Sequence, residues 1–387
     1  GVGTAIAAWI GGGLTDLAVY RFGGTSMPRG TSLYDAGAPG SGLPFTYPPF
    51  AAVLFTIAAV PPYAVTAGLW NACAVLALAV TVRTWASSLG LRDGDRWPAA
   101  LVVAGLVPEP VWSNLAFAQV NLFVMAAVTV DLLRADRRSA GLLVGLVAGV
   151  KLTPLVFVVL LMLVGRHRAA LVAVTTFGAT VAVGFAAVPR QAWAYWTDVL
   201  WDPGRPGSAA YAGNQSLLGV LTRAAGQEPS TIGWLVLAGS VSLGVLGLAA
   251  LVWRRGSPAW GLGLGAVAML LASPISWSHH WVWAVPITLL LALRTGRSRW
   301  WVAGAWTVVF AARPIWWPPA GSDRELSWTP WQHLVGGSYV LAGLGLAVIA
   351  ALDLRAGAWQ HASGGQSGDA APARPGAAAS RARPDGP

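Results

Sequence analysis

The chain has 387 residues, of which 55% are hydrophobic and only 10% are charged, and its mean hydropathy is +0.59. Soluble domains carry about a quarter charged residues, so this composition excludes an ordinary soluble protein and indicates an all-α protein that crosses a membrane several times. The net charge of +10 does not indicate nucleic-acid binding, because the basic residues are scattered in short clusters between apolar runs.

The chain opens with an apolar stretch, residues 1–13, that is too short to span a membrane and lacks the basic start of a signal peptide. We expect it to be the outer end of a first helix. Asp16 follows in "LTDLAVYRFGG", just beyond that helix, with Arg21 further along the same segment. Asp16 is either a solvated loop residue or a functional acid, and the sequence leaves both interpretations open.

Tyr47 precedes two prolines in "LPFTYPPFAAVLF". Proline suits the first turn of a helix, so a helix is expected to open at these prolines. Tyr47 then lies at the membrane interface, where aromatic residues are common.

Basic clusters set the orientation, because arginine and lysine are enriched in cytoplasmic loops. The clusters are Arg92/Arg96, Arg134/Arg137/Arg138, Arg166/Arg168, Arg254/Arg255, Arg294/Arg297/Arg299 and the tail from Arg355. We place all of them in the cytoplasm, so the polar segments between them lie outside the membrane or in its outer leaflet.

The apolar runs between these clusters predict about ten to twelve helices, in a membrane domain that spans residues 1–355. The candidate spans are residues 50–83 (broken near "VPPY"), 97–111, 122–133, 169–188, 232–253, 260–272, 281–293, 300–316 and 334–352. Residues 140–164 start and end beside cytoplasmic arginines, so they are expected to form two short helices that turn at "KLTP". Residues 356–387 are rich in Gly, Ala, Pro, Ser and Arg and predict a disordered cytoplasmic tail.

Lys151 is the only lysine of the chain, and it lies at that turn, deep in an apolar run. An ionisable residue inside a membrane is costly and usually functional, although lysines near helix ends also extend to the interface without any function. A buried ammonium group requires an anion, and a lipid phosphate in an outward-facing cavity is a suitable one.

Other polar residues interrupt the apolar runs. Gln119 and Asn121 lie in "LAFAQVNLFV", and Asn214 and Gln215 lie in "AGNQSLLGV". Amides at such a depth either join helices together or contact a ligand, and the sequence does not distinguish the two roles.

The densest polar segment is "ASPISWSHHWVWAVP", which contains Ser276, His279 and His280. Neighbouring residues of a helix point about 100° apart, so the two histidines do not chelate one ion by themselves, and no other metal motif is present. A histidine here serves either as a phosphate donor or proton carrier, or merely as part of an interfacial aromatic belt. The sequence also lacks a nucleotide-binding fingerprint, so we expect neither a metal nor another cofactor.

Six stretches, taken together, resemble the actinobacterial membrane mannosyltransferases of glycosyltransferase family 87, which have GT-C architecture. They are "DLAVYR", "LPFTYPPFAAVLF", "AQVNLFV", "GLVAGVKLTPLVFVV", "AGNQSLLGVL" and "SPISWSHHWVW". They occur in the family's order and cover roughly residues 14–295.

The resemblance implies an inverting, metal-independent mannosyl transfer from polyprenyl-phosphate mannose to a mannosylated glycolipid such as a phosphatidylinositol mannoside or lipomannan. The reaction is expected on the outer side of the plasma membrane, with Asp16 as the base. Lys151, Arg21 and a histidine of the 279–280 pair are then expected to offset the phosphate charge. The remaining candidates are expected to contact substrate, and they are Tyr47, Gln119, Asn121, Asn214, Gln215 and Ser276.

Two other interpretations fit the same residues. A transporter or flippase of a polyprenyl-linked lipid also places charged groups at mid-depth, although it predicts an internal symmetry that we do not find. A structural subunit of an envelope-synthesis complex is the third interpretation.

Overall fold

The computed structural model describes residues 14–29, 32–91, 97–134, 138–202, 204–294, 296 and 298–357. Across these ranges the fold is helical, without a strand, and has only two isolated bridges, Gly37–Pro44 and Asn214–Trp277. The predicted all-α membrane fold is thereby confirmed. The stretch 1–13 and the tail beyond residue 357 lie outside the described residues, so both predictions remain untested.

The first half of the chain contains α2 (Thr15–Arg29), α3 (Pro49–Ala59), α4 (Tyr63–Ser88), α5 (Trp97–Ala104), α6 (Glu109–Phe117), α7 (Asn121–Leu133), α8 (Leu142–Ala148), η1 (Thr153–Leu155), α9 (Val156–Leu163) and α10 (His167–Ala187). The second half contains α11 (Pro189–Thr197), η2 (Val199–Trp201), α12 (Leu217–Ala225), α13 (Thr231–Arg254), α14 (Pro258–Ala272), η3 (Ser278–Trp283), α15 (Ala284–Ala292), α16 (Arg299–Ala312), η4 (Pro314–Trp316), η5 (Arg324–Ser327), α17 (Pro330–Gly336) and α18 (Ser338–Arg355).

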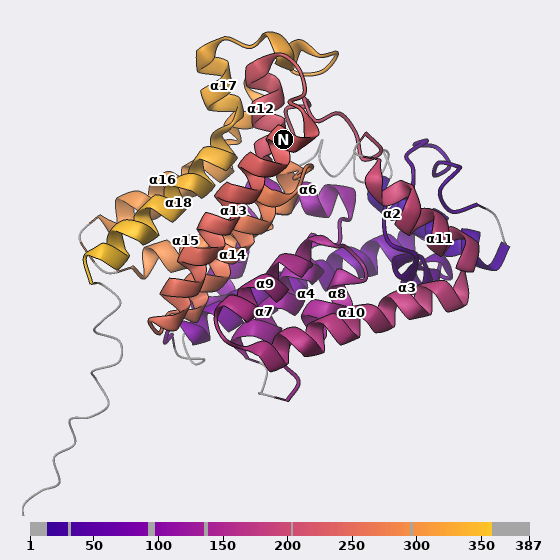
Figure 1. The fold of residues 1–387 in the computed structure, drawn as a ribbon, viewed down its shortest axis with the longest axis horizontal. Coiled ribbons are helices and arrows are strands. Elements are labelled where there is room, and N and C mark those ends of the chain that lie inside the picture. The colour runs from indigo at the N-terminus through magenta and orange to yellow at the C-terminus, as the bar shows by residue number, and fades with distance from the viewer. Residues whose placement is uncertain are drawn as a thin grey trace, which may run out of the picture.

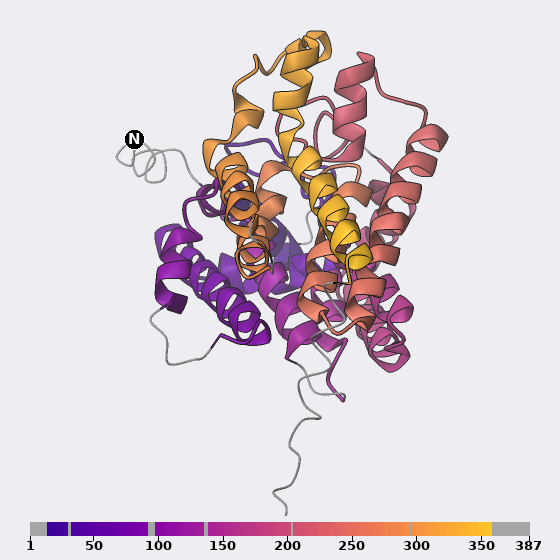
Figure 2. The ribbon, with the colours of Figure 1, turned by 90° about the vertical axis from the view of Figure 1, so that its left-hand side faces the viewer.

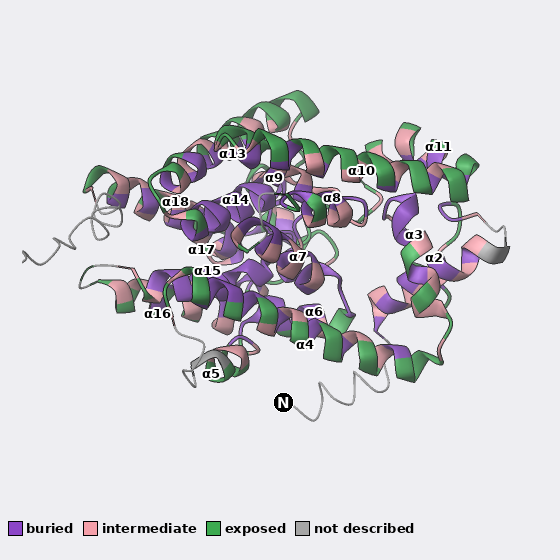
Figure 3. Ribbon diagram, turned by 90° about the horizontal axis from the view of Figure 1, so that it is seen from below, coloured by how far each residue is buried: buried purple, intermediate pink, exposed green. Residues whose placement is uncertain are grey.

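Helix α14 lies at the centre of the C-terminal half, and it packs against α7, α9, α13, α15 and α18. Every residue from Ala259 to Leu271 is buried, as expected for a helix that is apolar on all sides and surrounded by others. The outer helices α4, α10 and α13 expose apolar faces instead (Figure 3). Exposed apolar faces on such long helices match a lipid environment rather than water.

Four helices in the described ranges are long and apolar enough to cross a membrane: α4, α10, α13 and α18. Helices α6 and α7 add a fifth if they are one span, bent by 118°, and α3, α14 and the η1–α9 segment are shorter apolar helices. The chain is therefore a multi-pass membrane protein, and the expected total of ten to twelve crossings stays a prediction.

Prolines and glycines divide several of the predicted spans. Pro61 and Pro62 separate α3 from α4 at the predicted "VPPY" break, and η1 divides residues 140–164 at "KLTP" as predicted. The predicted span 97–111 is wrong, because the helix stops at Ala104 and a new one begins after Pro108. Residues before Tyr47, for which the sequence predicted no helix, contain α2.

Helix direction alternates between two sides of the molecule. α7, α9, α13 and α18 each end close to an arginine of the predicted cytoplasmic clusters, whereas α8, α10, α14 and α16 run back from that side. Figures 1 and 2 show α12 and α17 projecting together at the opposite end from the last turn of α18.

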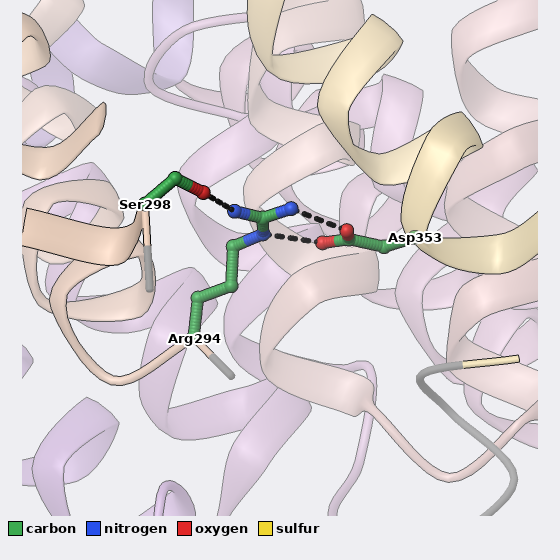
Figure 4. A network of polar contacts seen from close by, with 3 residues as sticks. All are labelled: Arg294, Ser298 and Asp353. Atoms are coloured by element: carbon green, nitrogen blue, oxygen red, sulfur yellow. Dashed lines mark hydrogen bonds and ion pairs between the residues drawn. The ribbon is translucent and has the colours of Figure 1, made fainter. Parts of the chain in front are cut away.

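On the arginine-rich side, an ion pair joins the ends of two helices (Figure 4). The Arg294 guanidinium donates to both carboxylate oxygens of Asp353 on α18, and it also donates to the Ser298 hydroxyl at 3.2 Å. This two-pronged contact fixes the end of α15 against the end of α18.

Candidate active site

One large cavity, of about 820 Å³, lies at the helix ends opposite the arginine clusters. Six of the predicted site residues line it, and they come from five separate parts of the chain: Asp16, Tyr47, Gln119, Lys151, His279 and His280. The volume suits a substrate much larger than a single sugar ring.

Asp16 lies in the first turn of α2, not in a loop as expected. Burial raises the pKa of its carboxyl from 3.8 to about 6, while a hydrogen bond from the Gln119 side chain and the charge of Lys151 partly offset this effect. A carboxyl with this pKa is mostly ionised near neutral pH and still basic enough to accept a proton.

The amide of Gln119 is oriented by two tyrosines. Its Oε1 atom accepts from the hydroxyl of Tyr20 at 3.2 Å and from that of Tyr47 at 3.3 Å, and the two hydroxyls lie 3.0 Å apart. The Nε2 group is thereby directed to Asp16. Tyr47, expected at the membrane interface, is instead buried in this network.

The turn between α6 and α7 places Gln119 and Asn121. Ala118 adopts a left-handed conformation with φ of 58°, which ends α6 and reverses the chain. Asn114 then holds the turn together, because its side chain donates to the carbonyl of Gln119 at 3.1 Å and its Oδ1 atom accepts from Asn121 at 3.2 Å.

Lys151 follows α8 at the break before η1, and its ammonium faces the cavity. Its Nζ atom lies 2.7 Å from Oδ1 of Asn121 and 3.0 Å from Nε2 of His280. Neither partner is an anion, so the charge of Lys151 is positioned but not paired. Asn121 is thus a residue that positions Lys151 and lies behind it, outside the lining of the large cavity.

The two histidines occupy different positions in η3. His280 contacts Lys151, whereas His279 packs edge-on against Phe117 and His280. The Nε2 atom of His279 is buried and has no hydrogen-bond partner, although the residue lines the cavity. A buried ring nitrogen without a partner is costly unless a ligand supplies one.

Three predicted substrate contacts belong to the scaffold instead. Asn214 donates to two carbonyls and accepts from the backbone of Ser276, whose own hydroxyl donates to the carbonyl of Leu270. Gln215 donates to the carbonyls of Ala212 and Gly336. The Asn214 side chain joins the segments 209–216 and 273–277, Gln215 connects the first of them to Gly336, and Ser276 connects the second to Leu270. None of these three side chains lines the large cavity.

Arg21 also lies outside the cavity lining. Its guanidinium donates to the carbonyls of Ala58 and Pro61, both at 2.7 Å, and to the Thr66 hydroxyl at 3.0 Å. The break between α3 and α4 leaves these carbonyls without helical partners, and the Arg21 guanidinium supplies their hydrogen bonds. From the sequence, this guanidinium was expected to contact phosphate.

The sequence interpretation missed several cavity residues. The cavity is also lined by Glu109, Trp112, Tyr211, Trp277 and Trp316. Arg205 lines it too, and its guanidinium donates to the carbonyl of Phe45, two residues before Tyr47. Glu109 carried a signal, because it is an acid between two prolines within an apolar region. No group of three or more His, Cys, Asp or Glu side chains suited to a metal occurs among the described residues.

Comparison with known proteins identifies relatives over most of the chain. The family described as glycosyltransferase family 87 matches residues 45–274. A polyprenol-phosphate-mannose-dependent α-(1-2)-phosphatidylinositol mannoside mannosyltransferase of Mycobacterium tuberculosis is 34% identical over 92% of this chain and 90% of its own length.

Two further relatives are named as polyprenol-phosphate-mannose-dependent α-(1-2)-phosphatidylinositol pentamannoside mannosyltransferases. The one from M. tuberculosis is 36% identical over 87% of this chain and 81% of its own length. The one from Mycolicibacterium smegmatis is 34% identical over 87% of this chain and 85% of its own length. No solved structure matches the chain. The relatives support the predicted transferase and not the transporter interpretation.

Proposed function

Because the chain belongs to glycosyltransferase family 87, we propose that it transfers a mannosyl residue from polyprenyl-phosphate mannose to a phosphatidylinositol mannoside in the membrane. The observation that carries the proposal is one cavity in which a carboxylate of suitable basicity faces an unpaired ammonium. Transfer to a lipid-phosphate leaving group requires both.

Asp16 acts as the general base. The acceptor hydroxyl oxygen attacks the anomeric carbon of mannose while its proton passes to the Asp16 carboxylate. The bond between that carbon and the phosphate oxygen breaks, and its electron pair leaves with the polyprenyl phosphate. A single displacement inverts the anomeric centre, so a β-linked donor gives an α-linked product.

Lys151 and the histidines receive the leaving phosphate. The Lys151 ammonium is fixed by Asn121 before the substrate arrives, so it stabilises the developing charge without reorganising. The unpartnered Nε2 atom of His279 supplies a second hydrogen-bonding group on the same wall. Tyr47 and Gln119 keep Asp16 in place in the same cavity.

The cavity opens on the outer side of the membrane. Its lining residues lie at the helix ends away from the arginine clusters, which the positive-inside rule assigns to the cytoplasm. The acceptor linkage is α-(1→2), as in the names of the relatives.

A transfer assay tests this function. Purified protein reconstituted into lipid vesicles is incubated with radiolabelled polyprenyl-phosphate mannose and a phosphatidylinositol mannoside, and the product is analysed for an added α-(1→2)-linked mannose. Wild-type protein is expected to form it, and Asp16→Asn is expected to lose at least about 100-fold in rate. Label that crosses a vesicle membrane without forming a new glycosidic bond would contradict the proposal and favour a transporter.

A further inference from the structure

The wall of the cavity around α6 and η4 is aromatic, and the catalytic steps above do not use it. Trp112, Tyr211, Trp277 and Trp316 all line it. The Tyr211 ring lies 5.9 Å from that of Trp277 and 5.8 Å from that of Trp316, measured between ring centroids. Tyr211 is 42% exposed, so this aromatic cluster presents ring surface to the open cavity.

Glu109 fixes the orientation of Trp316. Its Oε1 atom accepts from the Ser278 hydroxyl at 2.8 Å and from Nε1 of Trp316 at 3.4 Å, and its Oε2 atom accepts from the Tyr339 hydroxyl at 3.0 Å. The side chain is only 1% exposed. A buried carboxylate whose two oxygens already have partners is better suited to positioning its neighbours than to taking a proton from a substrate.

The backbone at Gly213 is also adapted to the aromatic cluster. A Cβ atom at this position would lie 2.8 Å from the Tyr211 ring and 2.9 Å from the Trp316 ring. Glycine therefore allows the two rings to pack against the same stretch of backbone.

Basic side chains are unevenly distributed around the cavity. Lys151 contacts His280, Arg205 lines the cavity just before residue 207, and Arg313 lies 5.3 Å from the centroid of the Trp112 ring without lining the cavity. In the described part of the chain, α6, η4 and residues 207–213 contribute no basic side chain to the lining. They contribute a carboxylate, Glu109, which disfavours a phosphate group. A neutral sugar fits this wall, because the C–H groups on one face of a pyranose pack against the electron-rich face of an aromatic ring.

We propose that this aromatic cluster is the subsite for the acceptor sugar, with Trp316 as the platform on which the sugar stacks and Glu109 as the residue that positions Trp316. The inference rests on the proposed function, since it assumes a sugar acceptor. It adds which wall holds that acceptor and which residues determine its affinity.

The test compares two neighbouring tryptophans. Trp316 lines the cavity, whereas Trp317 is 65% exposed and does not line it. In the transfer assay, Trp316→Ala is expected to raise the KM for the acceptor about tenfold, with the KM for the donor unchanged. Trp316→Phe retains a ring and is expected to raise it less, and Trp317→Ala is expected to match wild type.

Variants of Glu109 provide a second test of the acceptor subsite. Glu109→Ala is expected to raise the acceptor KM in the same way, and Glu109→Gln, which keeps an oxygen for Trp316 and Ser278, is expected to raise it less. The double variant Glu109→Ala/Trp316→Ala is expected to be no worse than Trp316→Ala alone, because Glu109 acts through Trp316. A large loss of kcat in Glu109→Gln would overturn the positioning role.

The outcomes separate the two proposals. If wild-type protein transfers mannose and the acceptor KM of Trp316→Ala is unchanged, the subsite is wrong and the proposed function stands. If wild-type protein forms no product, the proposed function fails. If Trp316→Ala does not fold, Tyr211→Ala carries the same prediction, and an unchanged acceptor KM in that variant overturns the subsite.

Discussion

Lys151 shows how a single charge is held ready for a ligand. Its ammonium has an amide oxygen and a ring nitrogen as partners, at 2.7 and 3.0 Å, and neither belongs to an acidic side chain. Placing a cation in a low-dielectric site is costly, and the charge of Asp16 offsets part of this cost for Lys151. Under the proposed function, a bound phosphate would offset more of it.

Lys151 and Arg21 give a matched pair of variants. Lys151→Met is expected to reduce transfer about 100-fold or more, because a preorganised cation facing the leaving phosphate is lost. Arg21→Met is expected to lower the melting temperature in detergent, because three hydrogen bonds at the α3–α4 break are lost. The donor KM of the folded Arg21→Met protein is expected to match wild type. A raised donor KM in Arg21→Met would return this arginine to the phosphate site.

The raised pKa of Asp16 predicts a pH dependence. Helix α2 is not among the described helices that are long and apolar enough to cross a membrane, and burial there raises this pKa to about 6. Because only the ionised carboxylate accepts a proton, the transfer rate is expected to fall as pH drops through 6, and this fall defines the midpoint. Burial lowers the pKa of Lys151 to about 7, so loss of the ammonium charge is expected to lower the rate again as pH rises above 7. Gln119→Leu removes a hydrogen bond that lowers the pKa, so the midpoint is expected to move to higher pH.

Gln191→Leu, on α11 and outside the lining of the large cavity, is the control and is expected to leave the midpoint unchanged.

The effect of Asp16 on the pH dependence of protein stability is expected to have the opposite sign to its effect on the transfer rate. A carboxyl whose pKa is raised by folding favours the folded state below its unfolded pKa of 3.8, and this contribution is lost as pH rises through 6. Asp16→Asn is therefore expected to be at least as stable as wild type at neutral pH.

For single residues, the sequence could not distinguish side chains that face a ligand cavity from side chains that hold the fold together. Asn214 and Asp16 are both polar residues beside apolar runs, yet Asn214 bonds only to backbone and Asp16 faces a cavity. The difference depends on which carbonyls the fold leaves without partners, and this is a tertiary property. Lys151 was predictable, because the one lysine of the chain within an apolar run has few structural roles.

Among the elements, the α2–α3 contact determines where Asp16 lies. The two helices pack closely, and a Cβ atom at Gly24 of α2 would lie 2.3 Å from the backbone oxygen of Phe55 in α3. Helix α2 was not predicted, because its glycines and polar residues give no apolar stripe. Its stability comes from packing rather than from its own sequence.

Gly24→Ala tests this contact. The added methyl group has no room, so α2 is expected to shift, with a loss of about 1–3 kcal/mol in stability and a lower transfer rate. Gly68→Ala on α4 is the control, because nothing lies within 4 Å of its Cβ position. Its stability and activity are expected to match or exceed those of wild type. Equal melting temperatures and rates for the two variants would contradict close packing at Gly24.

Breaks within predicted spans were predictable only where the sequence marks them strongly. "VPPY" ends α3 as expected, because proline cannot continue the preceding turn, and "KLTP" lies at the expected break, between the end of α8 at Ala148 and η1. The bend between α6 and α7 depends on Ala118 in a left-handed conformation, which alanine adopts only when its surroundings require it. The sequence "AFAQVN" gives no sign of this bend.

For the whole molecule, the alternating helix directions place the arginine clusters and the cavity at opposite ends. Composition was sufficient to predict a multi-pass helical protein, because apolar runs of this length have few alternatives. It was not sufficient to predict the cavity, which parts of the chain from Thr15 to Trp316 build together. Asp16 and Lys151 share this cavity, and the proposed function requires that it faces the outer side of the membrane.

Site-directed labelling measures directly which side of the membrane the cavity faces. Cys73 is the single cysteine and is exposed on α4, so it is first replaced by alanine. Leu43→Cys then places a thiol at the cavity lining, and Ala356→Cys places one beyond the arginine-rich end of α18. In intact spheroplasts, a membrane-impermeant maleimide is expected to label position 43 and not position 356, and preincubation with polyprenyl-phosphate mannose is expected to slow labelling at 43. Labelling of position 356 alone would contradict the account.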